Sequence, residues 1–278
     1  MQRIFRLGMI ILWPLLMGLT VAPVIQHDQP QTIVSTARSE QTTGIQEEWL
    51  GVYQDEEKVG YLQRRLTPTK TGYAWEEHWW LSLQLANETY VTHTEVRAQA
   101  DHTCALTSFS LWSSGGETAL YIKADITKQS SSRRKIQGES INNGEATSFT
   151  VALDLPLHLP PLCQMAVPRS SRPGTNREFS VFNPLSLQAE TIRLTTLGME
   201  TIEINGQQQI ATKLVSGMSD SALYLWVDHE GRTLREEIAP SVILQRESQE
   251  LATTGSWQER GILLPNATTD VLDAAGKE

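Results

Sequence analysis

YAWEEHWWLSLQL at residues 73–85 and YVTHTEVRAQA at residues 90–100 are the stretches that decide the fold class. Both are rich in Val, Thr, Tyr and Trp, which fit the pleated, half-buried surface of a β-sheet. In the second stretch, the odd-numbered residues from 91 to 99 are markedly more polar than the even-numbered residues between them. A period of two residues is typical of a strand with one solvated and one buried face. The two stretches therefore predict adjacent strands with a turn at Asn87.

The same pattern extends outward in both directions, with turn residues about every eight to twelve positions. The predicted strands are residues 50–53, 59–66, 73–85, 90–100, 105–113 and 119–126, then 176–182, 190–197, 200–204, 208–215, 222–228 and 233–238. Asn205 with Gly206 favours a two-residue hairpin, and Glu230 with Gly231 is a weaker signal of the same kind. Because no crossover helix is evident between the strands, we expect them to pair antiparallel in a mainly β fold.

Two segments interrupt this rhythm. Residues 155–173 contain five prolines, which predicts a connecting segment or a single helical turn. Arg133, Arg134 and Lys135 form a basic cluster, which we interpret as a solvated loop or strand edge. The net charge of −9 and the pI near 5.2 argue against nucleic acid as a partner, because phosphate binding needs clustered Lys and Arg.

The N-terminus predicts a membrane segment. Arg3 and Arg6 precede an uncharged run at residues 7–25, about 19 residues, which as a helix spans roughly 28 Å. Acidic residues predominate after the run, so the N-terminus should stay inside and the body should be exported. Residues 1–25 are therefore either an uncleaved signal-anchor or a signal peptide. Thr20 and Ala22 suit a cleavage site, but a proline follows it.

The remaining chain divides into three parts. Residues 26–47 are rich in Gln, Thr and Ser and predict a flexible tether. Residues 48–254 carry the strand pattern and form the β-rich body. Residues 255–278 lose the pattern and are assigned as a C-terminal tail.

No catalytic arrangement is evident in the sequence. The histidines show neither helix spacing nor a zinc-like interval to cysteine, and there is no glycine-rich phosphate loop or complete nucleophile elbow. We therefore expect no enzyme activity, no cofactor and no metal. Cys104 and Cys163 are the only cysteines, and two alternatives stay open: an extracytoplasmic disulfide, or two buried thiols acting as small apolar side chains.

Tryptophans are the candidate ligand-binding residues. On a concave sheet face they would line an apolar cavity that suits a lipid or an acyl chain. Trp79 and Trp80 must point to opposite faces of a regular strand, so one of them is covered by another segment or contributes to a ligand or partner surface. The candidate residues are Trp75, Trp79, Trp80, Trp112 and Trp226.

Two series of residues resemble an uncharacterised family of exported bacterial modules that occur alone or in front of transglutaminase-like peptidase domains. The first series is Trp49, Gly51, Tyr53, Lys58, Val59, Gly60, Tyr61, Gly72 and Tyr73. The second is Phe182, Asn183, Pro184, Leu185, Ser186, Gly198, Glu200, Gly206, Leu225, Trp226, Val227, Asp228, Gly231, Arg232, Leu234, Arg235 and Glu236. The resemblance covers about residues 48–252.

The resemblance implies a strongly curved antiparallel sheet, a half-barrel similar to the periplasmic carriers of lipoprotein acyl chains. It implies no activity. The residues also give a structural account of the motif positions: Gly60 and Gly231 would lie where a strand begins or turns and accept positive φ. Trp49, Tyr61 and Trp226 would fill a core between the sheet and a covering segment.

Together these observations predict a non-enzymatic envelope module that binds an apolar ligand on the concave face of its sheet. Its location would be the inner membrane, single-pass with the body in the periplasm, or the periplasm itself after cleavage. The alternative is a scaffold or accessory subunit of an envelope enzyme such as a transglutaminase-like peptidase. Its contact surface would be a sheet edge or the Trp79/Trp80 region.

Overall fold

The computed structural model describes residues 45–85, 88–115, 118–130, 133–159, 163, 172–183, 188–218, 221–239 and 242–255. In these residues the chain forms a 15-stranded sheet and one short helix, α3 (Gln249–Thr253). The predicted N-terminal membrane helix, most of the tether and the tail beyond residue 255 lie outside the described residues.

The strands of the first half are β1 (Gln46–Gln54), β2 (Glu57–Thr69), β3 (Gly72–Leu85), β4 (Glu88–Asp101), β5 (Leu106–Gly115), β6 (Thr118–Lys128), β7 (Arg134–Asn142), β8 (Glu145–Leu153) and β9 (Leu157–His158). Those of the second half are β10 (Asn176–Asn183), β11 (Gln188–Ile204), β12 (Gln207–Met218), β13 (Ser221–Val227), β14 (Thr233–Ala239) and β15 (Val242–Glu247).

The sheet is almost entirely antiparallel, as predicted. Its strand order is β8-β7-β6-β5-β4-β3-β2-β1-β15-β14-β13-β12-β11-β10-β9. Strands that follow one another in the chain therefore lie side by side, except β8 and β9, which lie at opposite ends of this order. The pairing of β1 with β15 joins the two halves of the chain. The exception to the antiparallel rule in the described sheet is the two-residue β9, which runs parallel to β10.

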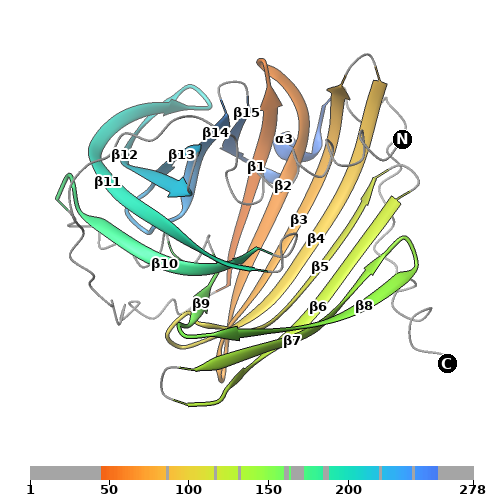
Figure 1. The fold of residues 1–278 in the computed structure, drawn as a ribbon. Coiled ribbons are helices and arrows are strands. Elements are labelled where there is room, and N and C mark those ends of the chain that lie inside the picture. The colour runs from red at the N-terminus through yellow and green to blue at the C-terminus, as the bar shows by residue number, and fades with distance from the viewer. Residues whose placement is uncertain are drawn as a thin grey trace.

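The sheet is strongly curved. Strands β3 to β8 form a long wall, and β10 to β13 curl back in front of it (Figure 1). At the end of the curl, Phe182 of β10 packs on Phe109 and Phe149 of the wall, with ring centroids 5.3 Å and 6.2 Å away. An isolated bridge between Ala105 and His158 also links β9 to the turn before β5. The sheet bends onto itself without forming a continuous closed ladder. The predicted fold class, a mainly β curved antiparallel sheet, is confirmed.

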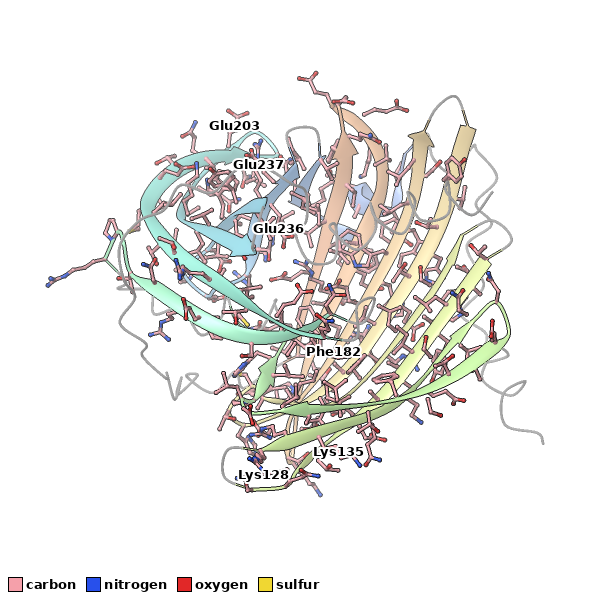
Figure 2. The ribbon with its side chains drawn as sticks, in the orientation of Figure 1. Lys128, Lys135, Phe182, Glu203, Glu236 and Glu237 are labelled. Atoms are coloured by element: carbon pink, nitrogen blue, oxygen red, sulfur yellow. The ribbon has the colours of Figure 1, made fainter. Side chains whose placement is uncertain are left out.

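The inner face of the curve holds the core. Residues that pair across the wall continue one buried row, namely Leu66, Trp75, Ala98, Phe109 and Ala124. All five are buried, and they pack against Phe182 and Leu157 from the curled part. Figure 2 shows Phe182 between the two parts of the sheet, whereas Lys128 and Lys135 lie at the far end of the wall. The two-residue period seen in the sequence therefore separates this core face from the outer face.

Several local predictions need correction. The expected strands at residues 190–197 and 200–204 are one strand, β11, which continues through a register shift at Gly198. In the basic cluster, Arg133 lies just before β7 and Arg134 and Lys135 are the first residues of β7, which pairs with β8 through a turn at Asn143 and Gly144. The local pattern did not predict β7, β8 or β15. The hairpin at Asn205 and Gly206 is confirmed, with φ of 52° and 75°.

Candidate functional site

A cluster of charged side chains lies on the inner face, where β2 and β3 meet β14. Arg64 is its centre: its Nε donates to Glu77 Oε2 at 3.0 Å, and its Nη1 donates to Glu236 Oε1 at 2.5 Å. Nη1 also lies 3.4 Å from Thr233 Oγ1, and Glu77 Oε1 accepts a hydrogen bond from the Trp79 indole at 2.5 Å. Arg64, Glu77 and Glu236 are each at most 5% exposed. Buried charges of this kind persist only when they are paired and hydrogen-bonded.

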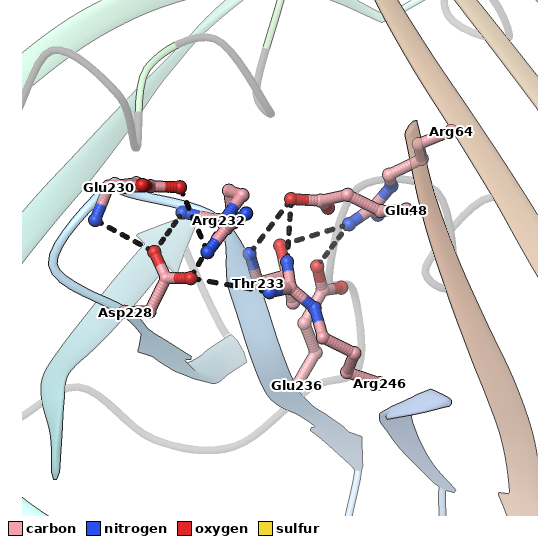
Figure 3. Close-up of polar contacts among 8 residues, drawn as sticks. All are labelled: Glu48, Arg64, Asp228, Glu230, Arg232, Thr233, Glu236 and Arg246. Carbon is pink, nitrogen blue, oxygen red and sulfur yellow. Dashed lines mark hydrogen bonds and ion pairs between the residues drawn. The ribbon is translucent and has the colours of Figure 1, made fainter. Parts of the chain in front are cut away.

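A second group continues the cluster toward the β13–β14 turn (Figure 3). Glu48 Oε1 accepts from the Thr233 backbone N–H at 3.2 Å and from Arg246 Nη2 at 2.9 Å. Arg246 Nη1 reaches Asp228 Oδ2 at 3.3 Å, and Arg232 Nε donates to the same oxygen at 2.8 Å. We call these residues the inner charged network: Glu48, Arg64, Glu77, Asp228, Glu230, Arg232, Thr233, Glu236 and Arg246.

The inner charged network depends on the curvature of the sheet. Arg64 and Glu236 lie on β2 and β14, which are separated in the sheet by β1 and β15. At about 4.8 Å per strand, a flat sheet would hold their backbones roughly 14 Å apart, with parallel side chains. Their contact at 2.5 Å requires the two strands to face each other across the bend. The network therefore ties β2 and β3 to β14 across the bend.

Protonation in the network follows from burial and charge. Burial alone would lower the pKa of Arg64, but the carboxylates of Glu236 and Glu77 raise the pKa overall, so the guanidinium keeps its charge. Burial raises the pKa of Glu48, and the opposing attraction of Arg246 is smaller. Partial burial acts to raise the pKa of Asp228, but hydrogen bonds from the Arg232 and Glu230 backbones and the Arg232 charge lower it. Asp228 is therefore firmly ionised, whereas Glu48 holds its proton more tightly than an ordinary glutamate.

Replacing Glu48 by Gln is expected to make stability less dependent on pH. The folded-state pKa of Glu48 is raised above 4.5, so its contribution to stability is fully present below that value and falls as pH rises through the folded pKa. Gln cannot ionise, so the stability of the variant in urea unfolding should gain on that of the native protein as the pH rises above 4.5. The control is Glu47→Gln on the more exposed neighbour. A difference in stability that does not change with pH would contradict this interpretation.

Sequence reasoning missed the inner charged network, although a signal was present. Arg64 stands between Leu62 and Leu66, on the face where alternation requires apolar residues. Glu77 interrupts Trp75 and Trp79 in the same way, as does Glu236 between Leu234 and Ile238. Charges in phase with the core face of three strands predict a buried ionic cluster.

The structure separates the five predicted tryptophans. Trp75 and Trp79 lie on the inner face, at 7% and 0% exposure, within two different clusters of the core. Trp80 and Trp112 lie half-buried on the outer face, which confirms that Trp79 and Trp80 point to opposite sides. Trp226 is buried in a separate cluster, where Lys213 and Arg235 lie over its ring. The five rings do not share one surface.

The outer face carries a row of neighbouring aromatic rings instead. From β1 to β5, Trp49, Tyr61, Trp80, His93 and Trp112 follow one another, with centroid separations of 5.9, 4.7, 4.6 and 5.0 Å. We call this set the outer aromatic row. Burial lowers the pKa of His93 to about 4, with a smaller effect from His78, so its ring is neutral at neutral pH. Cross-strand ring pairs of this kind each stabilise a sheet by roughly 0.5–1.5 kcal/mol.

The two cysteines are free thiols in the structure. Cys104 belongs to the core of the wall and Cys163 to the core of the curled part. Burial raises the pKa of Cys104 to about 11, and burial also raises the pKa of Cys163. In the structure the two cysteines are therefore buried thiols that act as small apolar side chains, which was one of the two alternatives.

The described residues hold no metal-binding cluster. No group of three or more His, Cys, Asp and Glu side chains there is arranged to hold a metal ion. Within the same residues, no helix has the length and apolar character needed to cross a membrane.

Comparison with known proteins supports the fold and goes no further. No family model matches the chain, and no curated protein matches it. Among solved structures, the chain is similar to the crystal structure of a β-barrel-like protein of domain of unknown function DUF1849 from Brucella abortus. That similarity has a TM-score of 0.55 and 8% sequence identity, and it covers 73% of this chain and 97% of that chain. The fold is therefore β-barrel-like, and at this identity the likeness shows the fold alone.

Proposed function

We propose that the protein is a non-enzymatic module of the cell envelope that binds a lipid or acyl chain on the inner face of its curved sheet. The observation that carries the proposal is the apolar character of both surfaces that meet across the curve. The wall contributes Trp75, Phe109 and Ile122, and the curled part contributes Leu157 and Phe182. An acyl chain would lie between these surfaces and exchange apolar contacts with them at about 25 cal/mol per Å².

The curled part is suited to separate from the wall and admit a chain. The edge of the curl is β9, which has only two residues, and an isolated bridge at Ala105 supplements the ring contacts there. Short edges with few backbone hydrogen bonds open at lower free energy than the centre of a sheet. The inner charged network lies on the side of β1 and β14 and would hold the bend while the edge opens.

A brominated fatty acid tests the proposal, because bromine quenches tryptophan fluorescence on close contact. With the full chain, we expect saturable quenching that decreases in Trp75→Phe and is unchanged in Trp112→Phe, since these rings lie on opposite faces. Mass spectrometry of gently purified protein should also release a bound lipid. Absence of any extractable lipid together with absence of saturable quenching would overturn the proposal.

An accessory role in an envelope enzyme complex, such as one with a transglutaminase-like peptidase, is the second candidate. One observation favours it: β8 forms an edge of the sheet, and its residues after Glu145 include neither Lys nor Pro. Such an edge is open to strand addition by a partner. A photo-crosslinker at Ser148 should then capture one stoichiometric protein in cells, and Thr150→Lys should abolish the product. Capture that survives Thr150→Lys would exclude pairing through this edge.

A further inference from the structure

Both cysteine thiols lie next to β9, at the edge where the curled part meets the wall. Ala105, which directly follows Cys104, forms the isolated bridge with His158 of β9. Leu159 packs on the core cluster that contains Cys104, and its carbonyl oxygen accepts from the backbone N–H and the thiol of Cys163, at 3.1 Å and 3.2 Å. Two adjacent residues at the end of β9 thus bring the two thiols to one place in the fold, although each belongs to a different core.

The two thiols also interact electrostatically. Burial is the main reason that the pKa of Cys163 lies well above its ordinary value, and the negative charge of a Cys104 thiolate raises it further. Charge interactions fall off with distance and are screened by solvent, so this influence requires both sulfur atoms to lie in the same buried region. A disulfide brings its two Cα atoms to roughly 5.5 Å. The edge at β9 has few backbone hydrogen bonds and can adjust to that separation.

The backbone at Cys104 is strained. Its φ of 61° is a left-handed conformation that glycine and asparagine adopt more readily than cysteine. Asp101 holds the turn: its carbonyl oxygen accepts from the Cys104 N–H at 2.9 Å, and its side chain accepts from the backbone N–H groups of Thr103 and Ala105 at 2.8 and 3.1 Å. Strain of this kind is found where a side chain has a function and the surrounding structure enforces the conformation. The thiol, and not a backbone preference, therefore explains a cysteine at this position.

We propose that Cys104 and Cys163 form a redox latch, in which a disulfide between them fastens the β9 segment to the turn before β5 and closes the edge of the curved sheet. The structure shows the reduced form. An external disulfide, such as oxidised glutathione, is the oxidant. The Cys104 thiolate attacks it, forms a mixed disulfide and displaces one external thiol; the Cys163 thiolate then attacks the Cys104 sulfur and displaces the other. The two protein thiols lose two protons and two electrons, which the two released thiols carry away.

Cys104 is the cysteine that reacts first in this sequence. It is 7% exposed, against 1% for Cys163, and it lies beside the exposed residues His102 and Thr103 of its turn. Burial raises the pKa of Cys104 to about 11, so the thiolate is scarce at neutral pH and the reaction should accelerate as the pH rises. The latch depends on the fold alone and does not require that the sheet binds a lipid.

Peptide mapping of the folded full chain after treatment with oxidised glutathione tests the latch. We expect a monomer that is lighter by two hydrogen atoms, in which the peptides carrying Cys104 and Cys163 are linked, and dithiothreitol should reverse the change. Two serine variants are the controls, because each keeps one thiol. Cys163→Ser should stop at a glutathione adduct on Cys104, whereas Cys104→Ser should leave Cys163 unmodified.

Hydrogen exchange then shows whether the disulfide closes the edge. The amide of Cys163 and those of the β9 segment should exchange about tenfold more slowly in the oxidised protein than in the reduced protein. The turn at Asn143 and Gly144, at the tip of the β7–β8 hairpin, is the internal control and should be unchanged. Glutathione adducts or linked dimers as the sole products would overturn the proposal. So would thiols that oxidise only in urea, or a disulfide that leaves exchange near β9 unaltered.

Discussion

Replacing Arg64 by methionine is expected to lower the free energy of unfolding by about 3–5 kcal/mol, because it leaves buried carboxylates without their counter-charge. Arg64 is the shared partner of Glu77 and Glu236, and all three side chains are buried. Methionine fills much of the volume of the arginine stem, so the loss of stability should come from the missing charge and not from a cavity. Urea unfolding of the full chain measures the loss.

Arg65→Met is the matched control for this experiment. Arg65 is the next residue on β2, but its side chain is 44% exposed and pairs with Glu47 and Glu76 on the outer face. Exposed ion pairs contribute about 0–1 kcal/mol, so this variant should unfold nearly like the native protein. If the two substitutions had equal small effects, the inner charged network would not hold the curved sheet together.

Replacing Gly60 by alanine is expected to destabilise the protein by about 3 kcal/mol or more, because a new methyl group would overlap the neighbouring strand. A Cβ atom at Gly60 would lie 1.9 Å from the carbonyl oxygen of Trp80. The contact is with backbone, so β2 and β3 would have to separate locally beside the outer aromatic row. The same displacement should increase the accessibility of Trp80. Chemical unfolding gives the stability, and acrylamide quenching of tryptophan gives the exposure.

Gly217→Ala is the control, since Gly217 lies in β12 without a positive φ, and a Cβ added there would have no atom within 4 Å. Alanine there should be neutral or stabilising by about 0.4–1 kcal/mol. A Gly60 variant as stable as the Gly217 variant would show that the strands adjust without cost.

The expectation that Gly60 lies at a strand start or turn with positive φ is wrong. Gly60 lies within β2, and glycine is needed there because the backbone of β3 at Trp80 approaches it closely. Gly231, with φ of 78°, does occupy a turn.

Local rules recovered most of the strands because they depend on neighbours in sequence. The turn at Asn205 and Gly206 was predictable since both residues adopt positive φ, which that dipeptide tolerates. The hairpin at Asp228 was also predictable: its side chain accepts the backbone N–H groups of Glu230 and Arg232 at 2.8 and 3.0 Å. By contrast, β15 is short, and its position in the sheet depends on pairing with β1, which lies almost two hundred residues earlier in the chain. No local pattern reports such a pairing.

The sequence by itself determined the strand-forming character of the body, the alternation of its two faces and the opposite directions of Trp79 and Trp80. These follow from the two-residue period of an extended chain, which is a local property. Only the tertiary structure decided that the sheet bends until β10 packs on β5 and β8, and that Arg64 meets Glu236. It also decided which tryptophans share a surface. These contacts join residues far apart in the chain, and their geometry comes from the accumulated curvature of many strands, to which each residue contributes little.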